Sequence, residues 1–377
     1  MCSYDGEILV DKSPVSGRER PWKTHKANSS LLAEAFSRIG KHNKAEKVRH
    51  CGSSLKFNVC PEGHEKRLAW ANFCRVRLCP MCAWRRSLVI AHQIKAVAHE
   101  AVKRQPMRWL FLTLTIRNCP GDVLGDTISH LMKSWDRLTR RKAFTDVVVG
   151  WFRSLEITRN LLEDTYHPHF HVLLGVKPSY FIKQKGYLTT RDWVSLWREC
   201  LRVDYDPVCH VRVVRNKRNI EREMKILEQK GIFLSPDGRL VEADLAGSAV
   251  AELSKYATKS EDYIVYNHYK QKQVRDKVKL VPVVSSGINW DKTDEVVATL
   301  DMALSRRRLL AYGGLLKEVW NELQAQGKVQ DVEDDHVDLV HVDDDSICRC
   351  SVCGSNMLEE LYSWIPDVQN YVKKEKA

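Results

Sequence analysis

The stretch HPHFHVLLGV, residues 167–176, alternates in the manner of a β-strand with one polar and one apolar face. Successive side chains of a strand point to opposite sides, so His169 and His171 share one face while Phe170 and Leu174 share the other. Paired imidazoles on a rigid strand offer two ligands to a divalent metal ion. The stretch therefore predicts a strand that carries two metal ligands.

Glu156 is the expected third ligand, because it lies on the preceding predicted strand and is the best candidate by chain proximity. A carboxylate beside two imidazoles suits Mn²⁺ or Mg²⁺ better than two imidazoles alone. The alternative interpretation treats His169 and His171 as ordinary core or surface residues. That interpretation explains a lone histidine more easily than a His-x-His pair in an apolar strand.

The segments around this strand predict the fold class. Strand patterns occur at residues 109–118, 147–160 and 210–216, and helical periodicity occurs at 84–104, 126–144, 193–201 and 248–259. The order is strand, helix, strand, strand, helix, strand, helix, with a short turn between the second and third strands. We therefore expect an α+β fold, an antiparallel central sheet with helices packed on it.

The charge of the chain is unevenly distributed. The net charge is +12, but residues 331–377 hold four Lys or Arg against twelve Asp or Glu, a net of −8, so the remainder carries +20. A basic body suggests a polyanionic partner, most simply nucleic acid. No apolar run is long enough to span a bilayer and the N-terminus has no secretory pattern, so we expect a cytoplasmic protein without a membrane partner.

The last predicted helix places chemically useful side chains on one face. Glu252 and Tyr256 are four residues apart, and Lys255 and Lys259 would flank them. A tyrosine hydroxyl is a poor nucleophile at its usual pKa, and a nearby lysine or a metal-polarised phosphate would help it. Glu252 could serve as a general base. Taken alone, a tyrosine on a charged helix is more often an ordinary surface or core-edge residue.

Cysteines cluster upstream of the strands. Cys79 and Cys82 have the spacing of a zinc knuckle, Cys74 lies five residues before Cys79, and the predicted hairpin of residues 51–74 would bring Cys51 close. We expect these four residues to bind a structural Zn²⁺, with Cys60 as the rival fourth ligand. Four arginines surround the cluster and suit phosphate contacts with DNA, or equally a solvated surface: Arg75, Arg77, Arg85 and Arg86.

A second cysteine cluster lies near the C-terminus. Cys348, Cys350 and Cys353 provide three thiols, and His341 or His336 could complete a second zinc site. The alternative is a redox-labile tail with no metal.

Three segments, in this order, resemble the motifs of single-tyrosine plasmid rolling-circle replication initiators of the HUH endonuclease superfamily. They are FLTLTIRN at 111–118, HPHFHVLL at 167–174 and ELSKYATK at 252–259. The segments NFCRVRLCPMCAWRR and RRRLLAYGGLLKE also resemble family members, so the similarity covers roughly residues 45–318. The combination is far more specific than any single motif.

This resemblance implies an HUH endonuclease fold of ferredoxin-like or palm-like type, with metal bound by His169 and His171. It implies that Tyr256 attacks a DNA phosphate at a single-stranded or hairpin nick site of a plasmid origin and stays attached to it. Glu252 would then hydrolyse DNA at termination. The resemblance further implies a bacterial cytoplasmic location and, as partners, a host helicase, a polymerase and a single-strand-binding protein.

The expected organisation follows from these segments. It comprises a flexible N-terminal arm at 1–44, a basic zinc-binding module at 45–100, an HUH nicking domain at 101–290, C-terminal helices at 291–330 and an acidic, cysteine-containing tail at 331–377.

The sequence is also compatible with two other classes of protein. An HUH transposase or relaxase would use the same chemistry on different DNA, although relaxases usually place the tyrosine before the histidines. A non-enzymatic, zinc-containing DNA-binding copy-number regulator would need neither the His-x-His pair nor Tyr256, and both are present.

Overall fold

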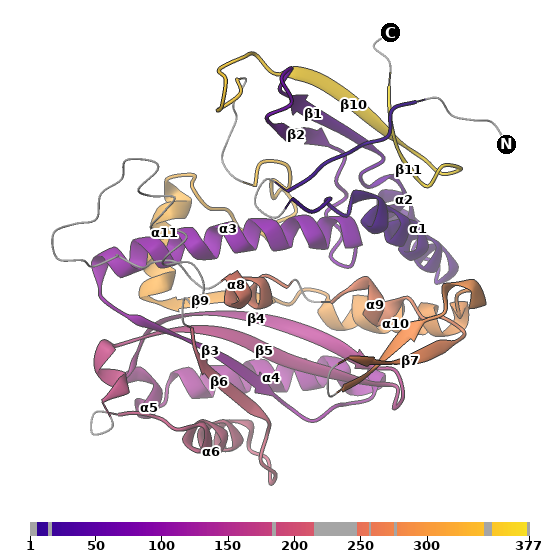
Figure 1. The fold of residues 1–377 in the computed structure, drawn as a ribbon. Helices are drawn as coiled ribbons and strands as arrows, with labels where there is room; N and C mark the ends of the chain where they lie inside the picture. Colours follow the sequence, from indigo (N-terminus) through magenta and orange to yellow (C-terminus); the bar gives the residue numbers. More distant parts are fainter. Residues whose placement is uncertain are drawn as a thin grey trace. The chain divides into compact units, whose positions relative to one another are not determined.

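The computed structural model describes residues 6–13, 17–182, 186–214, 247–255, 258–274, 277–342 and 349–374. The chain forms two compact units. Unit 1 comprises Met1–Arg86, Thr258–Ser305 and Asp334–Ala377, and unit 2 comprises Ser87–Ala257 and Arg306–Glu333. Both units mix helices with antiparallel sheets, which confirms the α+β class (Figure 1).

Unit 2 is built on a five-stranded sheet in the order β6-β3-β5-β4-β9, and all of its strand pairs are antiparallel (Figure 1). Its strands are β3 (Arg108–Thr115), β4 (Val148–Asn160), β5 (Thr165–Val176), β6 (Cys209–Val213) and β9 (Leu310–Gly314). The histidine-bearing stretch at residues 167–176 belongs to the central strand β5. Strand β5 starts at Thr165, earlier than expected, because the hairpin turn occupies only residues 161–164.

Helices cover both faces of this sheet. They are α4 (Leu124–Thr139), α5 (Lys142–Thr145), α6 (Thr190–Leu201), α8 (Gly247–Leu253) and α11 (Leu315–Ala325), with short 3₁₀ turns at Gly121–Val123 and Pro178–Phe181. On one face Trp135 of α4 contacts Phe170, with ring centroids 6.0 Å apart. On the other face Trp320 of α11 stacks on Tyr312, which itself contacts Phe152.

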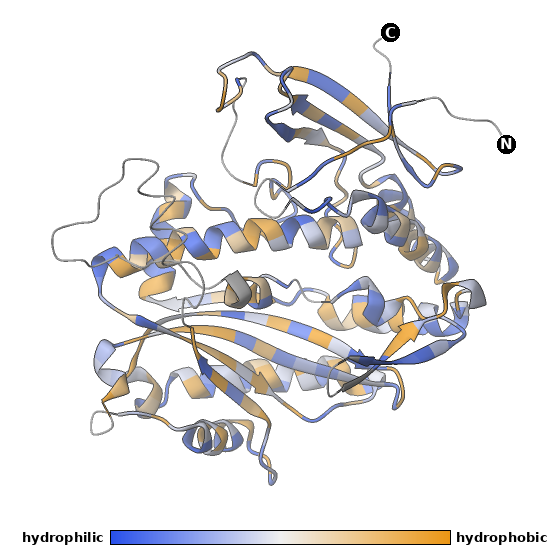
Figure 2. Ribbon diagram, in the orientation of Figure 1, coloured by the Kyte–Doolittle hydropathy of each residue, from blue (hydrophilic) through white to orange (hydrophobic). Residues whose placement is uncertain are grey.

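Helix α3 (Pro80–Arg104) begins in unit 1 and continues into unit 2. Figure 2 shows hydrophobic and hydrophilic positions side by side along α3 and α4, as expected of helices that bury one face. Within the described ranges, no helix is both long and apolar enough to cross a membrane.

Strand β9 differs from the prediction that residues 291–330 form only helices. The chain passes the sheet edge so closely that a Cβ atom at Gly313 would lie 2.1 Å from a carbon of Trp151. Gly314 adopts φ +55°, a conformation that costs other residues free energy. The glycine pair therefore permits an edge strand where helical periodicity alone suggested only a break.

Unit 1 contains a four-stranded sheet in the order β11-β10-β1-β2 and a separate ribbon of two strands. Its strands are β1 (Ser54–Val59), β2 (Lys66–Ala71), β7 (Tyr269–Val274), β8 (Lys277–Pro282), β10 (Leu358–Ile365) and β11 (Asn370–Lys373). Its helices are α1 (Trp22–Arg38), α2 (His42–His50), α9 (Ser260–Tyr263) and α10 (Trp290–Leu304), with a 3₁₀ turn at Val284–Ser286. The pairing of β1 with β2 confirms the predicted hairpin.

Two segments expected to be loosely ordered are structured where the structure describes them. In the predicted N-terminal arm, Trp22 is buried at the start of α1 and its Nε1 donates to Asp11 Oδ2 at 2.7 Å. In the predicted acidic tail, Val337 and Leu339 are buried and β10 pairs with β1. Apolar residues placed between the charges give these segments a face to bury, which the average composition concealed.

Helix α8 ends at Leu253 and is therefore shorter than the helical pattern predicted at residues 248–259. The Ser254 hydroxyl donates to the carbonyl of Ala251 at 3.3 Å, a local bond that competes with continued helix. The helix begins at Gly247, one residue before the start of the predicted helical pattern.

Candidate functional site

Three potential metal ligands converge on one face of the unit 2 sheet. The register of β4 and β5 sets Glu156 directly opposite His169, and His171 lies one pleat further along the same face. Glu156 Oε2 is 2.8 Å from His171 Nε2 and 3.5 Å from His169 Nε2. The side chains are almost fully enclosed, with exposed fractions of 3% for Glu156, 7% for His169 and 6% for His171.

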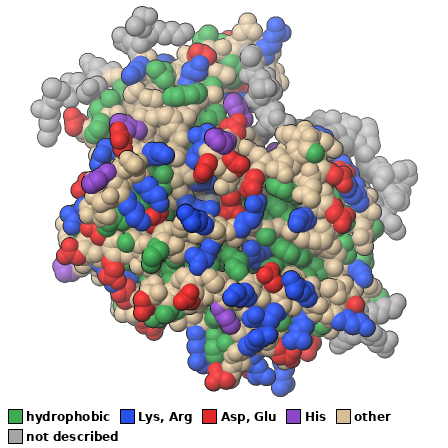
Figure 3. All heavy atoms as spheres, turned by 180° about the vertical axis from the view of Figure 1, so that it is seen from behind, with side chains coloured by type: hydrophobic (Ala, Val, Ile, Leu, Met, Phe, Trp, Pro, Cys, Tyr) green, Lys and Arg blue, Asp and Glu red, His purple; other side chains and the backbone are tan. Residues whose placement is uncertain are grey.

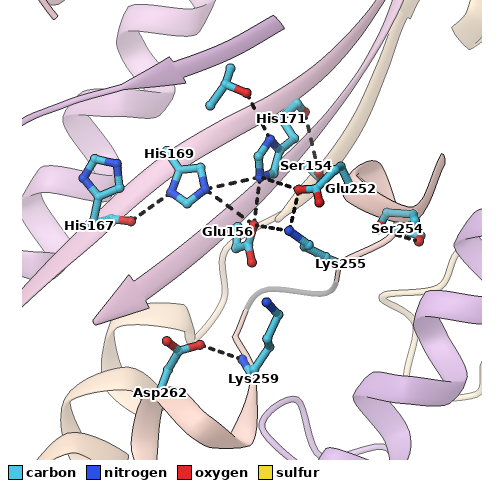
Figure 4. Close-up of polar contacts among 12 residues, drawn as sticks. Ser154, Glu156, His167, His169, His171, Glu252, Ser254, Lys255, Lys259 and Asp262 are labelled. Carbon is cyan, nitrogen blue, oxygen red and sulfur yellow. Dashed lines mark hydrogen bonds and ion pairs between the residues drawn. The ribbon is translucent and has the colours of Figure 1, made fainter. Parts of the chain in front are cut away.

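The remote nitrogen of each imidazole is anchored (Figure 4). His169 Nδ1 lies 3.0 Å from the carbonyl of His167, to which it donates, and His171 Nδ1 lies 3.3 Å from the hydroxyl of Thr113. These bonds turn both Nε2 atoms toward Glu156, and the two nitrogens are 3.3 Å apart. Such outer bonds fix the ring orientation and tautomer of metal-binding histidines.

The electrostatics of the cluster favour an ionised carboxylate. Burial on its own would raise the pKa of Glu156, but hydrogen bonds from His169 and His171 and the charge of Lys255 hold that pKa well below its usual range. The carboxylate is therefore negative at neutral pH and ready to accept a cation. One carboxylate and two Nε2 atoms within 4.8 Å of one another fit a divalent metal ion.

Two of the four predicted catalytic side chains lie beside this triad. Glu252 Oε2, from α8, is 3.9 Å from His171 Nε2, and Lys255 Nζ is 3.8 Å from Glu156 Oε2 (Figure 4). Lys255 also forms an ion pair with Glu252. Tyr256 lies outside the described residues. Lys259 belongs to unit 1, where its backbone N–H donates to Asp262 Oδ2 at 3.0 Å.

Of the tyrosines that follow, Tyr263 is unsuited to act as a nucleophile. It is buried in unit 1, and its hydroxyl donates to the carbonyl of Leu78 at 2.8 Å. Burial raises the pKa of Tyr263 well above its ordinary value. A phenol that is enclosed, paired and hard to ionise cannot reach a phosphate.

The four cysteines predicted to share a metal lie together in unit 1. The sulfurs of Cys51, Cys74, Cys79 and Cys82 all lie within 4.8 Å of one another. Sγ of Cys82 is 3.5 Å from that of Cys51 and 3.7 Å from that of Cys74. A tetrahedral ion with metal–sulfur bonds of about 2.3 Å holds its sulfurs about 3.8 Å apart, so the spacing fits such a site.

The surroundings of the four sulfurs also suit thiolates. The backbone N–H of Cys74 donates to Cys51 Sγ at 3.3 Å, and that of Arg75 donates to Cys82 Sγ at 3.2 Å. Lys26 is only 1% exposed, and its ammonium donates to the carbonyls of Arg49 and Cys51. Burial lowers the pKa of Lys26, and anionic sulfurs nearby oppose that shift. A buried cation beside the cluster offsets negative charge on it.

The prediction of a DNA contact is contradicted by burial for Arg85 and Arg86, and it stays a prediction for Arg75 and Arg77. Arg85 and Arg86 are buried, and Arg85 donates to the carbonyls of Leu339 and Val340 at 2.8 and 2.9 Å. Arg75 and Arg77, which are half-buried, donate to the carbonyls of Val337 and Leu304. These guanidinium groups satisfy backbone carbonyls inside unit 1. The chain expected to be a tail supplies most of those carbonyls, which residue spacing could not reveal.

Replacement of Arg85 by methionine should therefore lower stability and leave DNA affinity unchanged. The variant leaves two carbonyls without a donor, at an expected cost of about 1–3 kcal/mol in the free energy of unfolding. Chemical denaturation measures that change, and fluorescence anisotropy with labelled DNA measures affinity at a temperature where the variant is folded. A large loss of affinity in the folded variant would restore the DNA-contact role.

The C-terminal cysteines have partners other than those expected. Cys350 and Cys353 lie with Cys60 and His64, with all four ligand atoms within 4.8 Å of one another. His341 is instead paired through Nδ1 with Asp338 Oδ2 at 2.8 Å, and Cys348 lies outside the described residues. Cys60 thus belongs to this second group and not to the first.

Three features of the sites were not predicted from the sequence: Thr113, Lys26 and the partnership of Cys60 with His64. Thr113 could have been found from the strand pattern, since it shares a face with Thr115 on the strand that pairs with β5. The Cys60-x₃-His64 spacing, with Pro61 and Gly63 between, is itself a metal-knuckle signal. Nothing in the sequence points to Lys26.

Comparison with known proteins adds independent information. A family model described as replication protein matches residues 65–372. A protein rep of Bacillus amyloliquefaciens is 37% identical over 377 residues, covering 98% of each chain. A protein rep of Streptococcus pneumoniae is 36% identical over 374 residues, covering 98% of this chain and 97% of its own. A replication protein of Staphylococcus aureus is 28% identical over 285 residues, covering 75% and 98%. No solved structure matches the chain.

Proposed function

Because the chain belongs to the replication protein family, we propose that it initiates plasmid replication by the rolling-circle route, as a metal-dependent nickase with Tyr256 as its nucleophile. The observation that carries this proposal is the enclosed triad of Glu156, His169 and His171, with Glu252 and Lys255 beside it. A protein that only bound DNA would have no need for converging ligands with oriented tautomers.

Glu156, His169 and His171 would hold the catalytic cation. Bound there, Mn²⁺ or Mg²⁺ supplies Lewis-acid polarisation of the scissile phosphate. The protein contributes the fixed donor geometry, through the bonds of His169 to His167 and of His171 to Thr113. Lys255 offsets the charge of the two nearby carboxylates.

The proposed cleavage is a transesterification. The Tyr256 oxygen forms a bond to phosphorus while the bond from phosphorus to the 3′ oxygen breaks. The phenolic proton is lost, and the leaving 3′ oxygen gains a proton to become the free hydroxyl that a polymerase extends. The phosphotyrosine retains the energy of the diester. Glu252, which is partly exposed, would take a proton from water or from an incoming hydroxyl at termination.

The surface supports binding to DNA. Figure 3 shows one face on which Lys and Arg side chains gather, most densely over its lower part. Exposed cations of unit 2 include Arg140, Arg141, Lys142 and Lys177. Such a surface binds phosphates without regard to sequence and gives salt-dependent affinity. We further propose that Cys51, Cys74, Cys79 and Cys82 hold a structural Zn²⁺ that stabilises unit 1.

The test is nicking of labelled single-stranded oligonucleotides that tile the replicon encoding this chain, with Mn²⁺ present. Wild type should give a specific cut and a slow-migrating, protease-sensitive product. His171→Ala should nick at least about 10³-fold more slowly, because a lost ligand removes several kcal/mol of charge stabilisation. The product is measured on a denaturing gel, and Mn²⁺ affinity by titration calorimetry.

His99→Ala is the matched control, because His99 lies exposed on α3 outside the triad. Its rate should stay within a few-fold of wild type. Origin binding by wild type without any cleavage or adduct would favour the non-enzymatic regulator. Undiminished nicking by His171→Ala would remove the metal role of the triad.

A further inference from the structure

A second group of potential metal ligands lies in unit 1. The distances between its ligand atoms are those expected around one bound metal ion. Cys60 Sγ is 3.5 Å from Cys353 Sγ and 3.7 Å from His64 Nδ1, and Cys350 Sγ is 3.9 Å from the same nitrogen. A tetrahedral zinc ion with bonds of about 2.3 Å to sulfur and 2.0–2.1 Å to nitrogen separates its ligands by about 3.5–3.8 Å. Cys60 and Cys353 are free thiols and are not joined by a disulfide, whose bond is about 2.05 Å.

Two tight turns, each closed by a glycine with positive φ, present these ligands. In the β1–β2 turn, the N–H of Gly63 donates to the carbonyl of Cys60 at 2.9 Å, and Gly63 has φ +75°. In the later turn, the N–H of Gly354 donates to the carbonyl of Cys350 at 2.9 Å, and Gly354 has φ +72°. Each glycine supplies a left-handed conformation that closes the turn around its two ligands.

A further backbone hydrogen bond joins the two ends of each turn. The N–H of Cys60 donates to the carbonyl of Glu65, and the N–H of Cys350 donates to the carbonyl of Ser355. The two turns are also joined to each other, because the Ser351 N–H donates to the Glu65 carboxylate at 3.0 Å. Cys60-x₃-His64 and Cys350-x₂-Cys353 are spacings that structural zinc sites use.

From this geometry we propose a second zinc site, of Cys₃His type, formed by Cys60, His64, Cys350 and Cys353. Three thiolates and one imidazole are ligands that select zinc over the oxygen-preferring cations expected at the catalytic triad. The ion ties the β1–β2 turn to the segment that leads into β10, and β10 lies against β1 in the same sheet. The site therefore anchors the C-terminal strands to the N-terminal half of unit 1.

The first test uses the unmodified chain and relies on the exposure of Cys353. An exposed free thiol reacts quickly with N-ethylmaleimide, whereas a zinc-bound thiolate is protected. Peptide mass spectrometry of the zinc-loaded protein should show Cys353 labelled at least about 10-fold more slowly than after EDTA treatment. Rapid labelling of Cys353 in the zinc-loaded protein would overturn the proposal.

The second test counts zinc by elemental mass spectrometry in variants whose fold is checked by circular dichroism. Cys353→Ser should bind about one zinc ion fewer per chain than wild type, because a serine cannot replace the thiolate. Cys200→Ser, which alters a buried cysteine outside every cluster of the described chain, should retain the wild-type content. A folded Cys353→Ser protein with unchanged zinc content would refute the second site. Neither test depends on nicking activity.

Discussion

Tyr256→Phe is expected to abolish both strand cleavage and the covalent protein–DNA product. Phenylalanine lacks the oxygen that would attack phosphorus, and no neighbouring group replaces it in the proposed reaction. Removal of a covalent nucleophile costs on the order of 10⁶-fold in rate in a well-studied protease, so cleavage should fall below detection. The measurement is a denaturing gel of labelled origin DNA, with and without protease treatment.

Tyr263→Phe provides the matched control. It removes a buried hydroxyl that donates to Leu78, so it should cost about 1 kcal/mol in the free energy of unfolding while nicking persists. Binding of origin DNA should survive in Tyr256→Phe, because the hydroxyl contributes little to the charge-driven contacts. An adduct that still forms in Tyr256→Phe would assign the nucleophile to another residue.

Cys79→Ala is expected to prevent unit 1 from folding stably. Cys79 is fully buried within the four-cysteine cluster and directly precedes α3. Structural zinc binding is worth about 10–16 kcal/mol in small zinc-dependent domains at neutral pH, whereas whole domains are stable by only about 5–15 kcal/mol. Loss of one ligand therefore removes an amount comparable to the entire stability of the unit.

Zinc content and thermal unfolding followed by circular dichroism test this expectation. Cys200→Ala is the control, since Cys200 is equally buried in unit 2 but belongs to none of the metal-ligand groups in the described chain. It should keep its zinc and lose about 1–3 kcal/mol, the ordinary range for a buried substitution. If Cys79→Ala melts like Cys200→Ala with full zinc content, the cluster is not a zinc site.

Some features of the fold could be predicted from the order of neighbouring residues in the sequence. The alternation of HFHVLLGV predicted a strand with His169 and His171 on one face, and β5 has that arrangement. The predicted hairpin between Cys51 and Cys74 is also present, with the four cysteines gathered at its base. Side-chain period and ligand spacing are local properties of a chain, so a sequence displays them directly.

Other features depend on which distant segments meet. Cys60 pairs with Cys353 across 293 residues, and Arg85 donates to carbonyls more than 250 residues away. Spacing predicted Cys60 as a rival ligand of the first cysteine group, whereas the structure places it in the second, and spacing predicted a DNA contact for Arg85, which is buried. An exposed arginine and a buried one that satisfies carbonyls look alike in sequence.

The sequence by itself determined the fold class, the histidine strand and the types of ligand available for metals. The tertiary structure decided which of these residues lie together and which segments pair. Strand register sets Glu156 opposite His169. The close approach of Gly313 to Trp151 allows β9 to form an edge strand. The pairing of β10 with β1 brings Cys350 and Cys353, which precede β10, close to His64. Register and long-range pairing depend on burial summed over many residues, and no local segment contains that information.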